Sequence, residues 1–360
     1  MDRVYNFAAG PAAMPLSVLE RAAREMTCYA QTGMSVMEMS HRSSMYLEIF
    51  QETEAVFREL MKVPENYSVL FLQGGATAQF AAIPMNLMTG SGKADYIDSG
   101  NFAHGALVEA EKYGRVRVVA SSREENYVRI PAWKDSDLDP EADYCYITTN
   151  NTIFGTRYTR LPETGKVPLV ADASSNILSE PFDLTRFGVL YAGAQKNIGP
   201  AGVTLVIVRR DLLGHASPIC PKVLDWTEMT EKDSMLNTPP TYAIYMAGLC
   251  MKWLKKQGGV EAIEKVNIEK SKLLYDLLDE SAFYIPKADP ASRSRMNVTF
   301  TTPDPDTDAL FVKEAAAKGL TNLKGHRMTG GIRASIYNAM PVEGVQALAR
   351  FMKEFEMEHK

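Results

Sequence analysis

The chain has 360 residues, 46% of them hydrophobic, and a formal net charge of −5 at pH 7. This length and composition are typical of a globular protein with about two domains. A nucleic-acid-binding protein usually presents a basic face, and this acidic chain contains no long Lys/Arg run. We therefore expect no nucleic-acid partner.

The sequence also gives no sign of export or membrane insertion. No apolar run approaches the ~18 residues that a membrane span needs, and the start, MDRVYNFAAGPAAMP, has no apolar signal core. The four cysteines, at 28, 145, 220 and 250, form neither a C-x-x-C pair nor a zinc-ligand spacing. Reduced cysteines, no metal site, no membrane contact and a cytoplasmic location are the expectation.

The first predicted elements follow an irregular lead, residues 1–15. Helices are predicted after Pro15, with Leu19, Ala22, Ala23 and Met26 on one face, and from about Ser44. Strands and helical patterns then alternate, with strands at 68–73, 94–100, 116–121, 144–150 and 167–173 and a helix at 74–88. Such alternation predicts an α/β fold with a mainly parallel sheet between helices. In such sheets ligands bind beyond the carboxyl ends of the strands.

The composition changes near Gly258. After it we predict helices over 260–280, 306–318 and from Pro341, and strands over 297–302 and 331–337. The predicted organisation is a large domain, 16–257, and a smaller α+β domain, 258–360, with the lead, 1–15, packing on the smaller one.

Four strand ends carry polar groups. One of them, YCYITTN, runs into Asn151 and Thr152, which taken alone would be a plain polar loop. The strand 68–73 runs into Gly74, Gly75, Ala76 and Thr77, where free N–H groups at a helix start would attract phosphate. Taken alone, an ordinary tight turn is the better interpretation of this weak motif. The strand 167–173 contains Asp172, which alone would be a helix or turn cap.

The segment GVLYAGAQKNIGPAG, residues 188–202, places Lys196 between an apolar strand and a turn stiffened by glycine and proline. A lone lysine is usually solvated surface. An aspartate, a lysine and a phosphate-sized turn at strand ends are together the parts that pyridoxal phosphate requires. The lysine would form a Schiff base, and the aspartate would keep the ring nitrogen protonated.

Basic groups occur in two further segments, His41-Arg42 in MSHRSS and His326, Arg327 and Arg333 in GHRMTGGIRASIY. A capping loop, with Ser43 or Ser44 as the cap, and a solvated basic edge strand are the alternatives. Guanidinium groups bind carboxylate and phosphate in fork geometry, so the set suits a substrate with two anionic ends.

Several segments in chain order resemble the phosphoserine aminotransferase family, within the class V aminotransferases of the fold-type I pyridoxal phosphate enzymes. They are NFAAGPA, MSHRS, FLQGGATAQF, NNTIFGT, ADASSNILS, YAGAQKNIGPAG, LNTPPTYAIY and GHRMTGGIRASIYNAMP. The resemblance implies reversible transamination between O-phospho-L-serine with 2-oxoglutarate and 3-phosphohydroxypyruvate with L-glutamate. It also links the family to 4-phosphohydroxy-L-threonine in pyridoxine synthesis.

The resemblance further implies a role for each matching residue. Lys196 and Asp172 would be catalytic, and one pyridoxal phosphate per subunit would contact them together with Ala76, Thr77, Phe102, Thr152, Gln195, Asn237 and Thr238. Asn237 and Thr238 would reach the phosphate from the other subunit of a homodimer with shared active sites. His41, Arg42, His326 and Arg327 would hold the substrate phosphate or side-chain carboxylate, and Arg333 the α-carboxylate. Phe102 stands where the family commonly has a tryptophan stacked on the ring.

Other classes of protein explain the sequence less well. A serine- or alanine-type aminotransferase would lack the need for two His-Arg pairs. A cysteine desulfurase needs a reactive cysteine, and Cys220 has no obvious activating group. A doubly wound oxidoreductase would need G-x-G-x-x-G, and a non-catalytic binding protein would not need Lys196 and Asp172.

Overall fold

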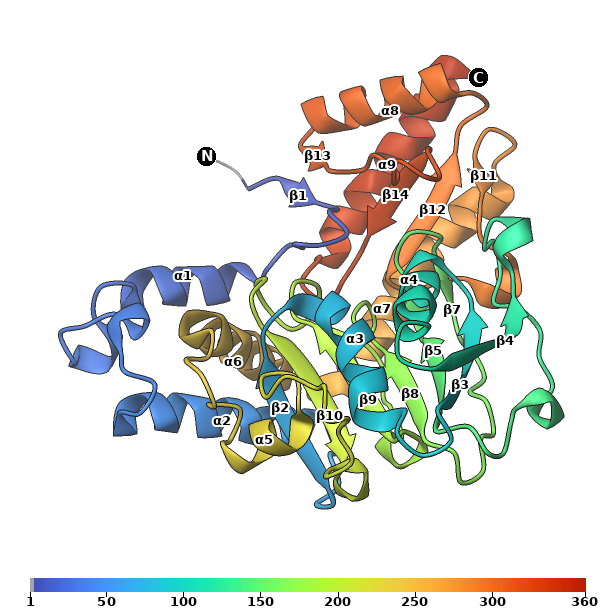
Figure 1. Cartoon of the computed structure of the whole chain (residues 1–360). Coiled ribbons are helices and arrows are strands. Elements are labelled where there is room, and N and C mark those ends of the chain that lie inside the picture. Colours follow the sequence, from blue (N-terminus) through green and yellow to red (C-terminus); the bar gives the residue numbers. More distant parts are fainter. Residues whose placement is uncertain (1–2) are drawn as a thin grey trace.

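The computed structural model describes residues 3–360. The large domain is built on a sheet in the order β2-β10-β9-β8-β5-β3-β4 (Figure 1). Its strands are β2 (Tyr67–Leu72), β3 (Lys93–Asp98), β4 (Arg115–Ser121), β5 (Tyr144–Thr148), β8 (Leu169–Asp172), β9 (Val189–Gly193) and β10 (Thr204–Arg209). The pairs β4–β3, β3–β5, β5–β8 and β8–β9 are parallel. The predicted α/β fold with a mainly parallel sheet is therefore confirmed.

β10 is the antiparallel strand of this sheet, and the sequence analysis did not predict it. It pairs antiparallel with both β9 and β2. β9 and β10 are thus neighbours joined by residues 194–203, and Lys196 lies in this connection. The missed run, TLVIVR, is buried on both faces, as are the neighbouring strands that were predicted from similar apolar runs.

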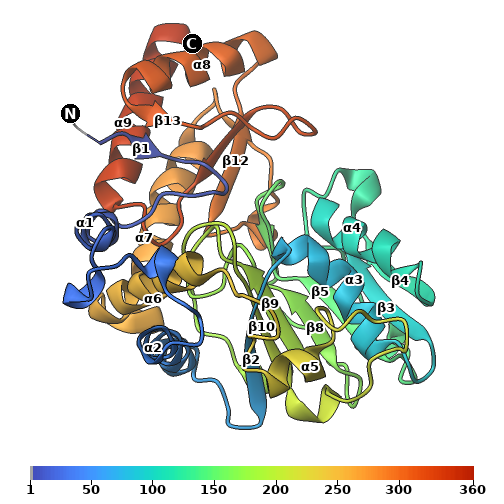
Figure 2. The same ribbon diagram turned by 60° about the vertical axis from the view of Figure 1, so that its left-hand side comes forward.

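Helices cover both faces of the sheet. One face packs on α2 (Ser44–Met61) and α6 (Thr241–Lys256), and the other on α3 (Gly75–Leu87) and α4 (Asn101–Ala110), as Figure 2 shows. Alternate strand residues supply the two cores, with Ile147 in the first and Tyr146 in the second. Such alternation follows from the period of two along a strand.

The first helix, α1 (Leu16–Glu25), shows a different buried face from the predicted one. Val18 and Ala22 are buried, whereas Ala23 is exposed and Met26 lies just beyond the helix, 36% exposed. α1 packs on α6 along a stripe of residues four apart. The prediction of Ala23 and Met26 on the buried face was wrong, because the contact with α6 is narrower than the apolar stripe.

The smaller domain has its own core. α7 (Gly259–Glu280), α8 (Pro305–Ala317) and α9 (Val342–His359) pack around an antiparallel sheet in the order β11-β12-β14. The strands are β11 (Ile285–Pro286), β12 (Asn297–Thr301) and β14 (Ile332–Ser335). Val260 at the start of α7 belongs to the core of the large domain and Leu277 to this one, so α7 joins both. The boundary at 258 stays a prediction.

The lead lies against the smaller domain. β1 (Tyr5–Asn6) pairs in parallel with β13 (Leu320–Thr321), and Phe7 is buried in the smaller domain's core. A short ribbon of β6 (Asn150–Asn151) and β7 (Thr156–Arg157) follows β5. In the part of the chain from residue 3 onward, no helix has both the length and the apolar character that a membrane crossing demands.

Candidate active site

A cavity of about 290 Å³ opens beyond the carboxyl end of β8, as expected for this type of sheet. Residues of the lead, the large domain and the smaller domain all line it. It brings together nine of the predicted site residues: Ala76, Thr77, Phe102, Thr152, Asp172, Gln195, Lys196, His326 and Arg333.

Lys196 is held at the floor of this cavity by the short connection between β9 and β10. The backbone N–H groups of Lys196 and Gly199 both donate to the carbonyl of Ala194, at 2.7 and 2.8 Å. The lysine Nζ donates to Thr152 Oγ1 at 2.6 Å. Gly10 packs against the lysine stem, where a Cβ would come within 3.3 Å of Lys196 Cγ. The amine therefore has one defined position.

Burial changes the acidity of this amine. It lowers the pKa of Lys196 from its ordinary value to about 8, partly offset by the negative charge of Asp172 and reinforced by the positive charge of Arg333. Near neutral pH a larger fraction of this amine is therefore unprotonated than of an ordinary lysine. This is the property that a general base or an amine nucleophile needs.

Asp172 ends β8 and is 4% exposed. Its Oδ1 accepts a hydrogen bond from the backbone N–H of Ser174 at 2.8 Å, so the turn-capping alternative describes one of its contacts. The carboxylate also lines the cavity that holds Lys196. A buried carboxylate here can pair with a cationic ring nitrogen.

The start of α3 supplies an anion site. Gly74 precedes the helix with φ of +92°, a conformation that favours glycine, and no side chain caps the first turn. The first N–H groups of a helix have no partner within it and attract anions. Since Gly75, Ala76 and Thr77 line the cavity, this turn is suited to phosphate.

The smaller domain contributes the cationic side of the cavity. Arg333 Nη1 donates to the carbonyl of Thr152 at 3.4 Å, and burial lowers the pKa of its guanidinium. Burial also lowers the pKa of His326, and the charges of Arg333 and Arg327 lower it further. The polar face of β14 is turned inward, with Ser335 and Tyr337 each 2% exposed. A solvated basic edge strand is therefore not what this segment forms.

Five predicted site residues lie outside this cavity: His41, Arg42, Asn237, Thr238 and Arg327. His41 and Arg42 precede α2, whose start is capped by Ser43 through a bond from the Tyr46 N–H. The capping role predicted for Ser43 is thus present beside the two basic groups. Asn237 and Thr238 sit beside the turn before α3, where Gln73 Nε2 donates to the Thr238 carbonyl at 2.9 Å.

The cavity also contains residues that the sequence analysis did not assign: Ala9, Gly10, Phe80, Ile153 and Ser174. The dense packing of Gly10 on Lys196 joins residues far apart in the sequence, so no local pattern could reveal it. Ser174 had a local signal, its position two residues after Asp172. Phe102, which was predicted to lie against the cofactor ring, is 38% exposed, and its ring centroid lies 5.7 Å from Lys196 Nζ.

Comparison with known proteins places this geometry in context. The family model described as aminotransferase class-V matches residues 4–348. Phosphoserine aminotransferase from Bacillus cereus is 53% identical over 360 residues, covering all of both chains, and that from a Janthinobacterium strain is 52% identical with the same coverage. A solved phosphoserine aminotransferase from Bacillus circulans superposes with a TM-score of 0.97 at 46% identity over both full chains. A pyridoxal phosphate-bound structure from Trichomonas vaginalis gives a TM-score of 0.93 at 41% identity, covering 98% of this chain and 100% of that one.

Proposed function

The chain belongs to the class-V aminotransferase family, and on this premise we propose that it is a phosphoserine aminotransferase. It transfers an amino group reversibly between O-phospho-L-serine and 2-oxoglutarate, giving 3-phosphohydroxypyruvate and L-glutamate. The observation that carries the proposal is the convergence of Lys196, Asp172 and the uncapped start of α3 in one cavity.

The residues of the cavity fit pyridoxal phosphate. The first turn of α3, with Gln195 nearby, suits the phosphate, Asp172 the ring nitrogen, Thr152 the ring hydroxyl and Phe102 the ring face. Bound at Lys196, one cofactor per subunit would supply an electron sink for the carbanion character that develops at the substrate Cα.

The side chains divide the remaining work. Arg333 binds the α-carboxylate, because its partly buried guanidinium lines the cavity and offers a fork of donors to a carboxylate. With the cofactor bound, the Lys196 amine would remove the proton from the substrate Cα as a general base and, as a general acid, would deliver it to the cofactor carbon on the other side of the amino nitrogen. Thr152 orients this amine through the 2.6 Å hydrogen bond, so the proton transfer starts from a fixed position.

We infer that a second subunit supplies several of the remaining predicted residues. His41, Arg42, Asn237 and Thr238 lie outside the cavity of their own chain, which supports a homodimer in which each subunit completes its partner's site. His41, Arg42, His326 and Arg327 would then bind the phosphate or the side-chain carboxylate of the substrate. The same pocket would accept 4-phosphohydroxy-L-threonine, and we expect the enzyme to work in the cytoplasm in serine synthesis.

A cysteine desulfurase is the alternative within this family, and its nucleophile would have to be Cys220. The environment of Cys220 does not favour that role. Burial, with a further contribution from the charge of Asp225, raises the pKa of the Cys220 thiol to about 11. The thiolate that such chemistry uses would be scarce at neutral pH.

The decisive experiment is an assay of the purified protein. We expect glutamate-dependent amination of 3-phosphohydroxypyruvate, together with a visible absorption band that borohydride bleaches. Borohydride should also fix the cofactor covalently to the protein. Lys196→Ala should lose both this covalent labelling and the activity while remaining folded. A protein that carries the band but shows no amination of 3-phosphohydroxypyruvate would remain a class-V enzyme with another substrate.

A further inference from the structure

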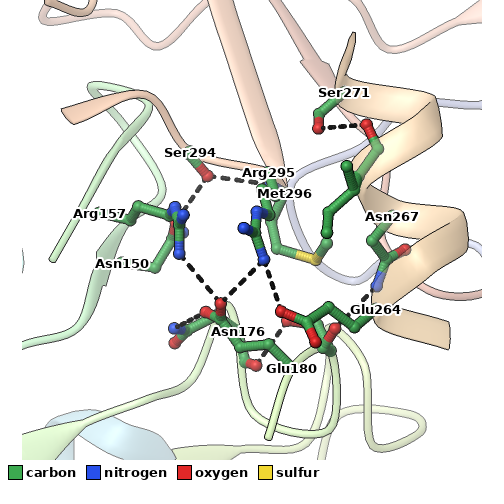
Figure 3. Close-up of polar contacts among 12 residues, drawn as sticks. Asn150, Arg157, Asn176, Glu180, Glu264, Asn267, Ser271, Ser294, Arg295 and Met296 are labelled. Atoms are coloured by element: carbon green, nitrogen blue, oxygen red, sulfur yellow. Dashed lines mark hydrogen bonds and ion pairs between the residues drawn. The ribbon is translucent and has the colours of Figure 1, made fainter. Parts of the chain in front are cut away.

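A buried carboxamide, Asn150, lies where the large and smaller domains meet behind the cavity. It stands on β6, two residues before Thr152, and is 3% exposed. Its Nδ2 donates to Ser175 Oγ at 2.8 Å and to Asn297 Oδ1 at 2.9 Å, and its Oδ1 accepts from Ser294 Oγ at 2.5 Å. Figure 3 shows Asn150 beside Ser294 in this setting. Both donors and the acceptor of the side chain are thus in use.

On the side of the large domain, Asn150 connects two segments that deliver site residues. Its own segment continues to Thr152, which holds the Lys196 amine. Ser175 Oγ also donates to the Asn150 carbonyl, at 2.7 Å, and Ser175 follows Asp172 by three residues. A shift of Asn150 would therefore move Thr152 relative to Asp172.

On the side of the smaller domain, Asn297 forms hydrogen bonds both to Asn150 and to β14. Asn297 is fully buried on β12, directly opposite Ser335. Its Nδ2 donates to Ser335 Oγ at 2.9 Å and to the Tyr337 hydroxyl at 3.1 Å. Ser335 and Arg333 are two residues apart and point to the same face of β14. The chain of bonds from Asn150 thus ends at the strand that carries Arg333.

The chemistry of the site demands a carboxamide. Asn150 must donate toward Asn297 Oδ1 and accept from Ser294 at the same time, which neither a carboxylate nor an apolar side chain can do. All three partners, Ser175, Asn297 and Ser294, are buried, and a buried polar group left without a partner costs far more than one exposed to water. The arrangement therefore has little freedom to relax.

A second set of contacts across the same boundary lies nearer the surface. The Glu180 carboxylate forms ion pairs with Arg157 at 3.0 Å and with Arg295 at 3.5 Å (Figure 3). Arg295 also forms an ion pair with Glu264 at 2.7 Å. These charged groups are partly exposed, so each pair contributes little. This charged set reaches Asn176, which donates to Glu180 at 3.0 Å, and it joins the domains through side chains other than the Asn150–Asn297 pair.

From these contacts we infer that Asn150 is a positioning residue for the reaction. Through Asn297 it fixes the place of Arg333 relative to Thr152 and Lys196, so that the α-carboxylate is bound where the amine can reach Cα. The kinetic consequence rests on the proposed function, whereas the coupling between the two domains does not.

The first test is Asn150→Ala, with Asn86→Ala as a matched control. Asn86 is also a buried carboxamide with three hydrogen bonds, to Ala82, Leu224 and Trp226, but lies at the far end of α3. We expect KM for glutamate and for O-phosphoserine to rise together by about tenfold in Asn150→Ala, with a smaller change in kcat. Asn86→Ala should lose thermal stability but keep both KM values. Equal KM values in the two variants would overturn the inference.

The second test does not depend on activity. Amide deuterium exchange on the chain without cofactor should speed up in residues 332–337 when Asn150 is replaced by alanine, but not when Asn86 is. Exchange confined to residues 148–152 would contradict the coupling even if the enzyme used another substrate. Should Asn150→Ala fail to fold, Ser175→Ala takes its place in both tests with the same criteria, because the Ser175 hydroxyl bonds to the carboxamide and to the carbonyl of Asn150. Arg295→Met, at the surface set, should leave KM unchanged.

Discussion

At the scale of single residues, the acidity of Lys196 is the property on which the chemistry depends. Burial brings the pKa of this amine to about 8, so its reactivity should rise as the pH passes through that value, because only the unprotonated amine is a nucleophile. Competitive acetylation of the cofactor-free protein, read by mass spectrometry, should give a midpoint near 8 at Lys196. Exposed lysines should titrate about two units higher. A midpoint near theirs would show that the amine is solvated.

Asp172 shifts the pKa of the same amine and, in the proposed function, would also contact the cofactor ring. Its charge raises the pKa of Lys196, so Asp172→Asn should move the acetylation midpoint to lower pH. The variant should also retain cofactor and lose activity by at least about a hundredfold, a loss typical of removing one preorganised electrostatic contact. Retention is checked by the visible band and activity by single-turnover rates. Nearly normal turnover would assign the ring-nitrogen contact to another residue.

Two arginines from the smaller domain should differ in the substrates they affect. Arg333 faces the cavity and Arg327 is exposed outside it. Arg333→Ala should weaken the binding of all amino acid substrates alike, because every one has an α-carboxylate. Arg327→Ala should weaken the binding of O-phosphoserine and glutamate by about tenfold, which corresponds to about 1.4 kcal/mol, and should change alanine binding little, because alanine has no second anionic group. Equal losses for alanine and O-phosphoserine in Arg327→Ala would rule out the phosphate role.

At the scale of elements, α2 and α6 pack closely because Gly248 has no side chain. A Cβ there would overlap Thr53 Oγ1 of α2, so Gly248→Ala should destabilise the fold by about 1–3 kcal/mol. Gly105 in α4 is the matched position, since a Cβ would make an ordinary contact at 3.5 Å with Phe80. Gly105→Ala should be neutral or stabilising by up to about 1 kcal/mol, because alanine favours helices. Chemical denaturation measures the free energy of unfolding of both variants. Similar changes in the two would contradict the packing argument.

Sequence patterns predicted most strands of the large sheet, including strands in which every residue is buried, and missed one equally buried strand. β8, β9 and β12 were found from apolar runs with polar ends, whereas β10 was missed. In the site, Asp172 could be found because it ends an apolar strand, and Lys196 because it follows one shortly before a glycine- and proline-rich turn. Asn150 could not, because its partner Asn297 is 147 residues away and a single asparagine has no periodic signal.

At the scale of the whole molecule, the proposed dimer explains why His41 and Arg42 lie outside the cavity of their own chain. If each site takes Lys196 from one subunit and Arg42 from the other, a hybrid of Lys196→Ala and Arg42→Ala subunits has one site with both defects and one fully intact. Two inactive proteins should therefore restore activity toward O-phosphoserine when unfolded together and refolded. Random pairing predicts about a quarter of the wild-type rate, since half of the dimers are hybrids with one working site each.

The control for this experiment is a mixture of two variants that damage the same set of contacts in one subunit. Lys196→Ala mixed with Asp172→Asn should restore nothing, because both residues line the cavity of a single chain and every hybrid site carries one defect or the other. The number of subunits can be read in parallel by light scattering. If the Lys196→Ala and Arg42→Ala mixture stays as inactive as the control while hybrids form, Arg42 serves its own chain. The phosphate pocket would then have to be assembled by a movement of the residues before α2 toward the cavity.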